Sequence, residues 1–167
     1  MSGTPDPRDA VRTGKLLALG FDFGVRRIGV AVGSGATGAA RPLTSIQARD
    51  GRPQWSEIDR IAAEWKPSIL VVGLPYNSDG SESEMTRRAR RFGHRIGNRL
   101  KLPVEFADER FSSREAEDRL RLQRHTGVRR RRVRKEDVDE MAAAIILQGW
   151  MDGEQEQGRE VDDQPVR

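Results

Sequence analysis

Apolar positions near the start of the chain follow the pattern of β-strands joined by a short turn. Residues 16–22 form a mostly apolar run that ends on a carboxylate, and residues 27–32 form a second apolar run. Gly24 lies between them, so the two runs predict a β-hairpin. A third strand is expected at residues 40–48, after a glycine-containing turn.

The apolar period becomes that of a helix after Pro53 and that of a strand again after Pro67. Pro67 ends the helix because proline lacks the backbone N–H that a helix interior needs. Residues 68–75 are apolar on both faces, which is typical of a central parallel strand. The side chains that share the apolar face of the helix are Trp55, Ile58, Ile61, Ala62 and Trp65.

Two capping-box patterns, each a serine followed three positions later by a glutamate, predict the starts of two more helices. Ser81 and Glu84 indicate a helix that ends near residue 100. Ser112 and Glu115 indicate a helix that ends near residue 124.

A short strand at residues 104–107 and a last helix at residues 136–151 complete the expected elements. Strands come first and then alternate with helices, which predicts an α/β fold. Its sheet would be mixed, with antiparallel first strands, then parallel strands, and helices on both faces. The polar ends predict a disordered arm at residues 1–14 and a disordered acidic tail at residues 153–167, around one domain at residues 15–152.

The amino-acid composition excludes several classes of function. The 167 residues include no cysteine, which excludes disulfides, thiolate metal sites and cysteine nucleophiles. No apolar run approaches the roughly 20 residues that a membrane helix needs, and the N-terminus lacks a secretory hydrophobic segment. We therefore expect a cytoplasmic protein that does not enter a membrane.

Charge is distributed unevenly behind the modest net value of +4. Residues 87–135 hold eighteen basic and six acidic side chains, whereas residues 136–149 hold four acidic and no basic ones. A local excess of this size indicates a polyanionic partner. Arginine accounts for 26 of the 30 basic residues and suits phosphate oxygens. A GC-rich genome would also favour arginine over lysine, but it does not explain the clustering.

Three carboxylate positions lie where apolar neighbours would hold them near the core. Asp22 ends one apolar strand, Asp108 and Glu109 end another, and Asp139 precedes the apolar face of the last helix. A carboxylate near a core needs a partner or a cation. Grouped acids make a hard oxygen site suited to Mg²⁺ or Mn²⁺, and two such ions about 3.5 to 4 Å apart support phosphodiester hydrolysis.

Simpler roles remain open for each acid taken singly. Asp22 could cap the turn at Gly24, and Asp139 could favour a helix N-terminus by its charge. The two histidines, His94 and His125, have the surroundings of surface residues, and no Ser-His-Asp arrangement or phosphate-binding glycine loop is evident.

Four motifs in this order resemble the YqgF family, also described as RuvX or Holliday junction resolvases. Bacterial members of that family are regarded as nucleases that mature the 5′ end of pre-16S rRNA. The resemblance runs from about residue 16 to residue 152 and implies an RNase H-like fold and a metal-dependent nuclease. Its motifs are Gly20-Phe-Asp-Phe-Gly-Val-Arg-Arg-Ile-Gly-Val-Ala, Val72-Gly-Leu-Pro, Asp108-Glu-Arg-Phe-Ser-Ser, and Asp139-Glu-Met-Ala-Ala with Ile-Leu-Gln148.

The resemblance also implies which residues are catalytic. Asp22, Glu109 and Asp139 match the positions that bind Mg²⁺ or Mn²⁺ and carry hydrolysis. Asp108 is held in reserve, because adjacent side chains on a strand point to opposite faces and only one of the two can be a ligand. The family usually has Leu-Thr-Thr where residues 111–113 read Phe-Ser-Ser, which keeps one apolar residue and two hydroxyls.

Arginines are the expected contacts to nucleic acid. Arg27 and Arg110 match family motifs and would either bind phosphate or orient the carboxylates. Two arginine-rich segments would hold the backbone mostly without reading sequence. The substrate would be structured RNA such as pre-rRNA, or branched DNA, and no small-molecule cofactor is expected. The arginines in these two segments are Arg87, Arg88, Arg91, Arg129, Arg130, Arg131 and Arg132.

Two other functions compete with the nuclease. Actin-like ATPases and sugar kinases also begin with a strand carrying Asp-x-Gly, but they usually follow it with hydroxyl residues and use two domains, whereas Val25 and Arg26 follow here. A non-catalytic nucleic-acid-binding factor would gain nothing from three acids beside phosphates. The sequence does not separate RNA from DNA. A resolvase that cuts two strands symmetrically would be a dimer, and an RNA-end trimmer could be a monomer.

Overall fold

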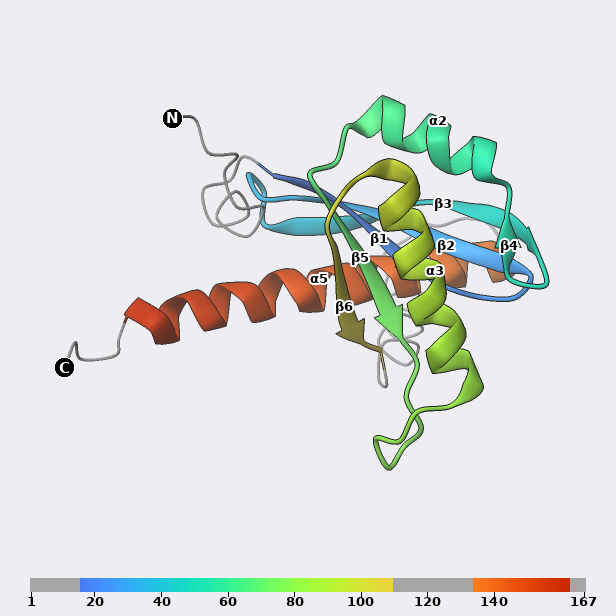
Figure 1. Cartoon of the computed structure of the whole chain (residues 1–167). Coiled ribbons are helices and arrows are strands. Elements are labelled where there is room, and N and C mark those ends of the chain that lie inside the picture. Colours follow the sequence, from blue (N-terminus) through green and yellow to red (C-terminus); the bar gives the residue numbers. More distant parts are fainter. Residues whose placement is uncertain (1–15, 110–133, 163–167) are drawn as a thin grey trace.

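A six-stranded mixed sheet forms the centre of the computed structural model, which describes residues 16–109 and 134–162 and the side chains up to residue 153 (Figure 1). The strand order is β4-β3-β2-β1-β5-β6. Strands β1, β2, β3 and β4 pair antiparallel in turn, and β5 and β6 extend the sheet parallel to β1. This confirms the predicted mixed sheet. The strands are β1 Leu17–Asp22, β2 Arg27–Ser34, β3 Ala39–Arg49, β4 Arg52–Pro53, β5 Ile69–Leu74 and β6 Val104–Asp108.

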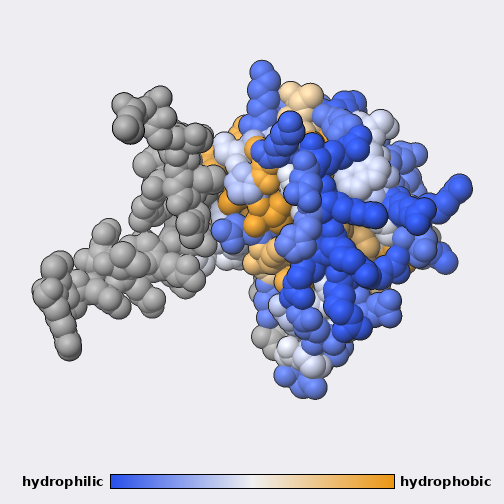
Figure 2. All heavy atoms as spheres, viewed as in Figure 1, coloured by the Kyte–Doolittle hydropathy of each residue, from blue (hydrophilic) through white to orange (hydrophobic). Residues whose placement is uncertain are grey.

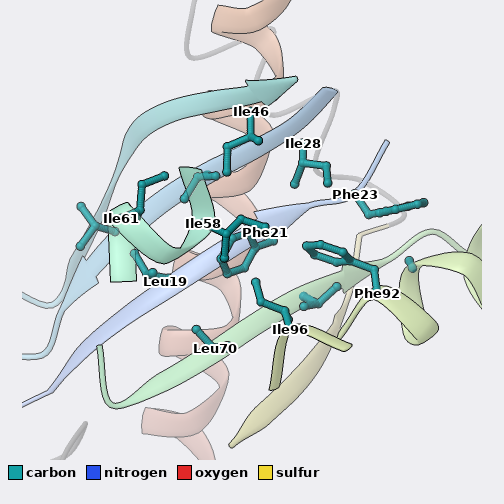
Figure 3. Packing of buried hydrophobic residues seen from close by; sticks show 14 of the residues in the cluster. Leu19, Phe21, Phe23, Ile28, Ile46, Ile58, Ile61, Leu70, Phe92 and Ile96 are labelled. Carbon is teal, nitrogen blue, oxygen red and sulfur yellow. The ribbon is translucent and has the colours of Figure 1, made fainter. Parts of the chain in front are cut away.

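Helices cover both faces of the sheet, as predicted. Helices α2 (Trp55–Trp65) and α3 (Glu84–Leu100) lie on one face, and α5 (Lys135–Asp162) lies on the other. Because successive strand side chains point to opposite faces, β1 sends Leu19 and Phe21 toward α2 and α3, and Ala18 toward α5. Figure 3 shows Phe21 of β1 close to Ile58 of α2, with Phe92 and Ile96 of α3 beside them.

The start of α3 differs from the prediction. Ser83, not Ser81, is the N-cap: its Oγ accepts a hydrogen bond from the Thr86 N–H at 3.2 Å, and its own N–H donates to Thr86 Oγ1 at 3.0 Å. Ser81 is held outside the helix instead, because its N–H and hydroxyl both donate to the Asp79 carboxylate. The prediction that Ser81 and Glu84 form the capping box was therefore wrong, although the helix does end at Leu100 as expected.

Replacing Ser83 with alanine should lower the free energy of unfolding by about 0.5 to 2 kcal/mol, because the N-cap hydrogen bond is lost. Urea denaturation of Ser83→Ala and Ser81→Ala measures the difference. Ser81→Ala should lower the free energy of unfolding clearly less. A larger loss in Ser81→Ala would mean that Ser81 is the N-cap, as the sequence predicted.

Two further elements differ from the prediction. The short strand β4, which pairs Arg52 with Arg49, was not predicted, and α2 begins at Trp55 just after it. The last helix extends to Asp162, ten residues into the predicted disordered tail, because its glutamates and glutamines are good helix formers and no proline interrupts them before Pro165.

The predicted arm and the helix expected at residues 112–124 lie outside the described residues. None of the described helices has the length and apolar character to cross a membrane.

Candidate active site

The carboxyl ends of β1 and β6 bring Asp22 and Glu109 together. β1, β5 and β6 run parallel, so their last residues lie together at one end of the sheet, beyond the carboxyl ends of these strands. Glu109 follows β6 directly and is fixed there by a hydrogen bond from its N–H to the Leu74 carbonyl at 3.2 Å. Asp22 lies two residues after Gly20, which faces Leu147 of α5, so Asp22 points to the α5 face of the sheet.

The two acids share a hydrogen bond and have strongly altered acidity. Burial raises the pKa of Asp22 from 3.8 to about 6. Burial, followed by the negative charge of Asp22, raises the pKa of Glu109 from 4.5 to about 9. Near neutral pH, Glu109 therefore keeps its proton and donates it to the Asp22 carboxylate.

Asp108 is the exposed neighbour of this pair, and its negative charge contributes to the raised pKa of Glu109. It lies on the opposite side of β6 from Glu109 and is exposed, whereas Glu109 is partly buried with its Oε2 inaccessible to solvent. Strand alternation therefore separates the adjacent acids as expected, and Glu109 is the one placed beside Asp22. The catalytic roles of these residues stay predictions.

Asp139 reaches the same region from the beginning of α5. Its negative charge contributes to the raised pKa of Asp22. Its Oδ2 accepts a hydrogen bond from Arg27 Nε at 2.8 Å, and both side chains are about a quarter exposed, at 26% each. Of the two roles left open for Arg27, the structure has it paired with a carboxylate, and this hydrogen bond raises the pKa of Arg27.

Two glycines allow these elements to approach. A Cβ atom at Gly29, which pairs with Asp22 across β1 and β2, would collide with the carbonyl oxygen of Asp139. A Cβ atom at Gly73 on β5 would collide with Glu109 Oε2. Neither glycine was expected in this role from the sequence. The signal that could have found them is glycine inside an apolar strand, which often marks close approach of another segment.

The donor chemistry of these acids fits a divalent cation. Asp22 and Glu109 are hard oxygen ligands that need a proton between them at neutral pH, and a cation could take the place of that proton. Within residues 16–109 and 134–153, however, no three acidic or histidine side chains already surround one point closely enough to hold an ion. Asp139, whose charge acts on Asp22, is the third acid that the sequence predicts, and Arg27 binds one of its oxygens.

The expected arginine contacts lie elsewhere. Arg87, Arg88 and Arg91 belong to α3, on the sheet face opposite α5. Arg88 Nη2 donates to the Asp50 carbonyl oxygen at 2.8 Å and to Asp50 Oδ1 at 3.1 Å. The remaining predicted contacts, Arg110 and Arg129 to Arg132, lie outside the described residues.

Solved structures identify the class of fold. A RuvC protein from T. thermophilus in complex with Holliday junction substrate aligns with a TM-score of 0.53 at 14% identity, covering 84% of this chain and 96% of that one. The yeast mitochondrial Holliday junction resolvase aligns with a TM-score of 0.53 at 10% identity, covering 95% and 89%. The fold is therefore the RNase H-like fold of these resolvases.

Within that class, the chain belongs to the RuvX family, described as Holliday junction resolvase, whose pattern matches residues 16–153. It is 50% identical over 137 residues to a protein of Chromohalobacter salexigens, covering 82% of this chain and 90% of the relative. It is 47% identical over 139 residues to a protein of Nitrosococcus oceani, covering 83% and 88%. Both relatives are named "Putative pre-16S rRNA nuclease". The chain is accordingly a nuclease, a hydrolase of phosphodiester bonds.

Proposed function

We propose that this nuclease processes the 5′ end of pre-16S rRNA during ribosome biogenesis in the cytoplasm, using Mg²⁺ or Mn²⁺ held by Asp22, Glu109 and Asp139. The observation that carries the reaction is the hydrogen-bonded pair of acids at the ends of β1 and β6. Support for the RNA substrate comes from relatives at 47% and 50% identity that bear the pre-16S rRNA name.

Each residue of the site has a defined task. Bound divalent ions supply an activated water and stabilise the leaving oxygen of the phosphodiester. Asp22, Glu109 and Asp139 would hold these ions, and Glu109 would release its proton to solvent on becoming a ligand. Arg27 orients Asp139 through its Nε–Oδ2 hydrogen bond and offsets part of the negative charge near the substrate phosphate.

Holding the nucleic acid falls to the arginines. Arg87, Arg88 and Arg91 provide positive charge on α3, on the sheet face opposite α5, and Arg110 and Arg129 to Arg132 are the further contacts expected from the sequence. Such contacts bind the phosphate backbone and do not select a base sequence. The cleavage position would then be set by the shape of the RNA.

A Holliday junction in DNA is the second candidate substrate. It is favoured by the description of the matching family and by the fold shared with a RuvC protein bound to such a junction. A purely binding role fits less well, because the negative charges of Asp22 and Asp139 would only repel a bound phosphate.

One experiment compares the candidates. Wild-type protein is incubated with Mg²⁺ or Mn²⁺ and either a pre-16S rRNA fragment or a four-way DNA junction. We expect cleavage of the RNA, and a fall of about two orders of magnitude or more in Asp22→Asn and Glu109→Gln, since a metal site contributes several kcal/mol to catalysis. Asp108→Asn, one residue from Glu109 and exposed, should retain most activity. Cleavage by Asp22→Asn at the wild-type rate would contradict the proposed site, and cutting of the junction alone would favour DNA.

A further inference from the structure

A hollow of about 420 Å³ opens beside the middle of α3, on the face of the sheet opposite α5. Its walls come from α3, from the turn between β3 and β4, and from the start of α2. Phe23, Phe92 and Trp55 pack together at this hollow, with ring centroids 5.4 Å apart for Phe23 and Phe92 and 6.4 Å apart for Trp55 and Phe92. The aromatic packing gives the hollow a firm wall.

Arginine dominates the lining. Arg52, Arg88, Arg91 and Arg95 line the hollow, and Asp50 is the one acidic residue among the lining residues. In the space-filling view, the most hydrophilic side chains form a band over α3 (Figure 2). We call this feature the α3 hollow. Its charge favours an anion.

Three of these arginines have no counter-ion among the described residues. Arg88 is bound by Asp50, and Arg99, further along α3, is bound by Asp59 through two hydrogen bonds of 2.8 and 2.7 Å. Arg52, Arg91 and Arg95 are exposed, and their side chains form no hydrogen bond or ion pair with any residue of the described part of the chain. Like charges gathered in this way bind an extended polyanion, which can meet several of them at once.

The α3 hollow and the candidate active site are linked in the sequence at the end of β1. Phe23 lines the hollow and Asp22 belongs to the site, and their Cα atoms are about 3.8 Å apart as neighbours in the chain. They point to opposite faces of the sheet, so a strand that reached both would have to bend sharply around this edge. A duplex resists such a bend, with a persistence length of about 50 nm for DNA, whereas a single strand does not.

We propose that the α3 hollow holds the phosphodiester backbone of a single-stranded RNA segment that flanks the bond to be cut, with Arg52, Arg91 and Arg95 as its phosphate contacts. This inference rests on the proposed function, because it takes the RNA flank to belong to the substrate. The proposal adds Arg52 and Arg95 to the expected contacts. Arg88 lines the hollow but is paired with Asp50, so it is not one of the proposed phosphate contacts. The substrate must then continue past the cut as an unpaired strand.

The test measures RNA binding as salt rises, without cleavage. All proteins carry Asp22→Asn, and the probe is a labelled pre-16S rRNA fragment with its single-stranded 5′ flank. Each phosphate contact to a single strand contributes about 0.7 to the slope of log K against log salt, so Arg91→Gln with Arg95→Gln should reduce the slope by about 1.4. Lysine at both positions should restore it. Arg41→Gln is the control, because Arg41 is exposed and lies over Trp65 at the other end of α2.

Each outcome decides the proposal. An unchanged slope in the double glutamine variant overturns it, as does equal slope loss with a probe that lacks the flank. Slope loss only with a four-way DNA junction also overturns it. Cleavage of the RNA by the protein with Asp22 intact is measured separately. Cleavage together with an unchanged salt slope in the double glutamine variant rejects RNA binding in the α3 hollow and keeps the proposed function. A loss of slope without RNA cleavage supports binding in the hollow and rejects the proposed function. The unfolding midpoint of every variant is checked to exclude misfolding.

Discussion

Asparagine in place of Asp22 is expected to make the metal-free protein more stable at pH 8. Burial raises the pKa of Asp22 from 3.8 to about 6, so the folded state prefers the protonated acid. The stability that this preference contributes is fully present below the unfolded pKa and is lost as pH rises through about 6. At pH 8 the folded protein holds a charged Asp22 at a cost of up to about 3 kcal/mol. Asparagine is uncharged and can still accept the Glu109 hydrogen bond.

Urea unfolding at pH 5 and pH 8 measures this effect, with and without Mg²⁺. The gain of Asp22→Asn should be larger at pH 8 than at pH 5. Mg²⁺ should stabilise the wild type more at pH 8, because binding releases the proton of Glu109, and should stabilise Asp22→Asn far less. A metal-free variant less stable than the wild type at pH 8 would contradict the raised pKa of Asp22.

Alanine at Gly29 is expected to be strongly destabilising. Its Cβ would overlap the Asp139 carbonyl oxygen, a backbone atom that moves only if α5 moves. Overpacking of this kind costs about 1 to 3 kcal/mol, and more where backbone must shift. Displacement of α5 would also carry Asp139 away from Asp22, so cleavage should fall together with stability.

The matched control for Gly29→Ala is Gly149→Ala on α5. No atom lies within 4 Å of a Cβ built at Gly149, so alanine there meets open space and should stabilise the helix by up to about 1 kcal/mol. Thermal unfolding of both variants provides the comparison. Equal stability of Gly29→Ala and the wild type would mean that α5 is not held against β2 as described.

Local patterns predicted the strands better than the helix start. Residues 68–75 are apolar on both faces, and such a run has few alternatives to a central strand; β5 confirms it. The start of α3 was misjudged because Ser81 has a nearby competitor in Asp79, whose carboxylate accepts both of its donors. A motif read alone does not reveal such competition.

The candidate site was partly accessible from the sequence. Asp22 and Glu109 both follow apolar strands, so they could be expected at the same end of the sheet, but they meet only by reaching across β5, where Gly73 has no side chain. The pairing of Arg27 with Asp139 spans 112 positions, and no local pattern encodes it. The α3 hollow was missed for the same reason, since Arg52 and Arg95 come together only when β4 packs beside α3.

The dependence of the site on α5 also has a consequence for synthesis on the ribosome. Asp22 and Glu109 emerge first, but Asp139 and the apolar face that seals Ala18 and Val71 belong to the last described helix. A nascent chain therefore carries the arginines of α3 before its acids are assembled. With Asp139 as the proposed third acid of the site, we expect such a chain to bind RNA before it can cut, and to cut only after α5 has been translated and has docked.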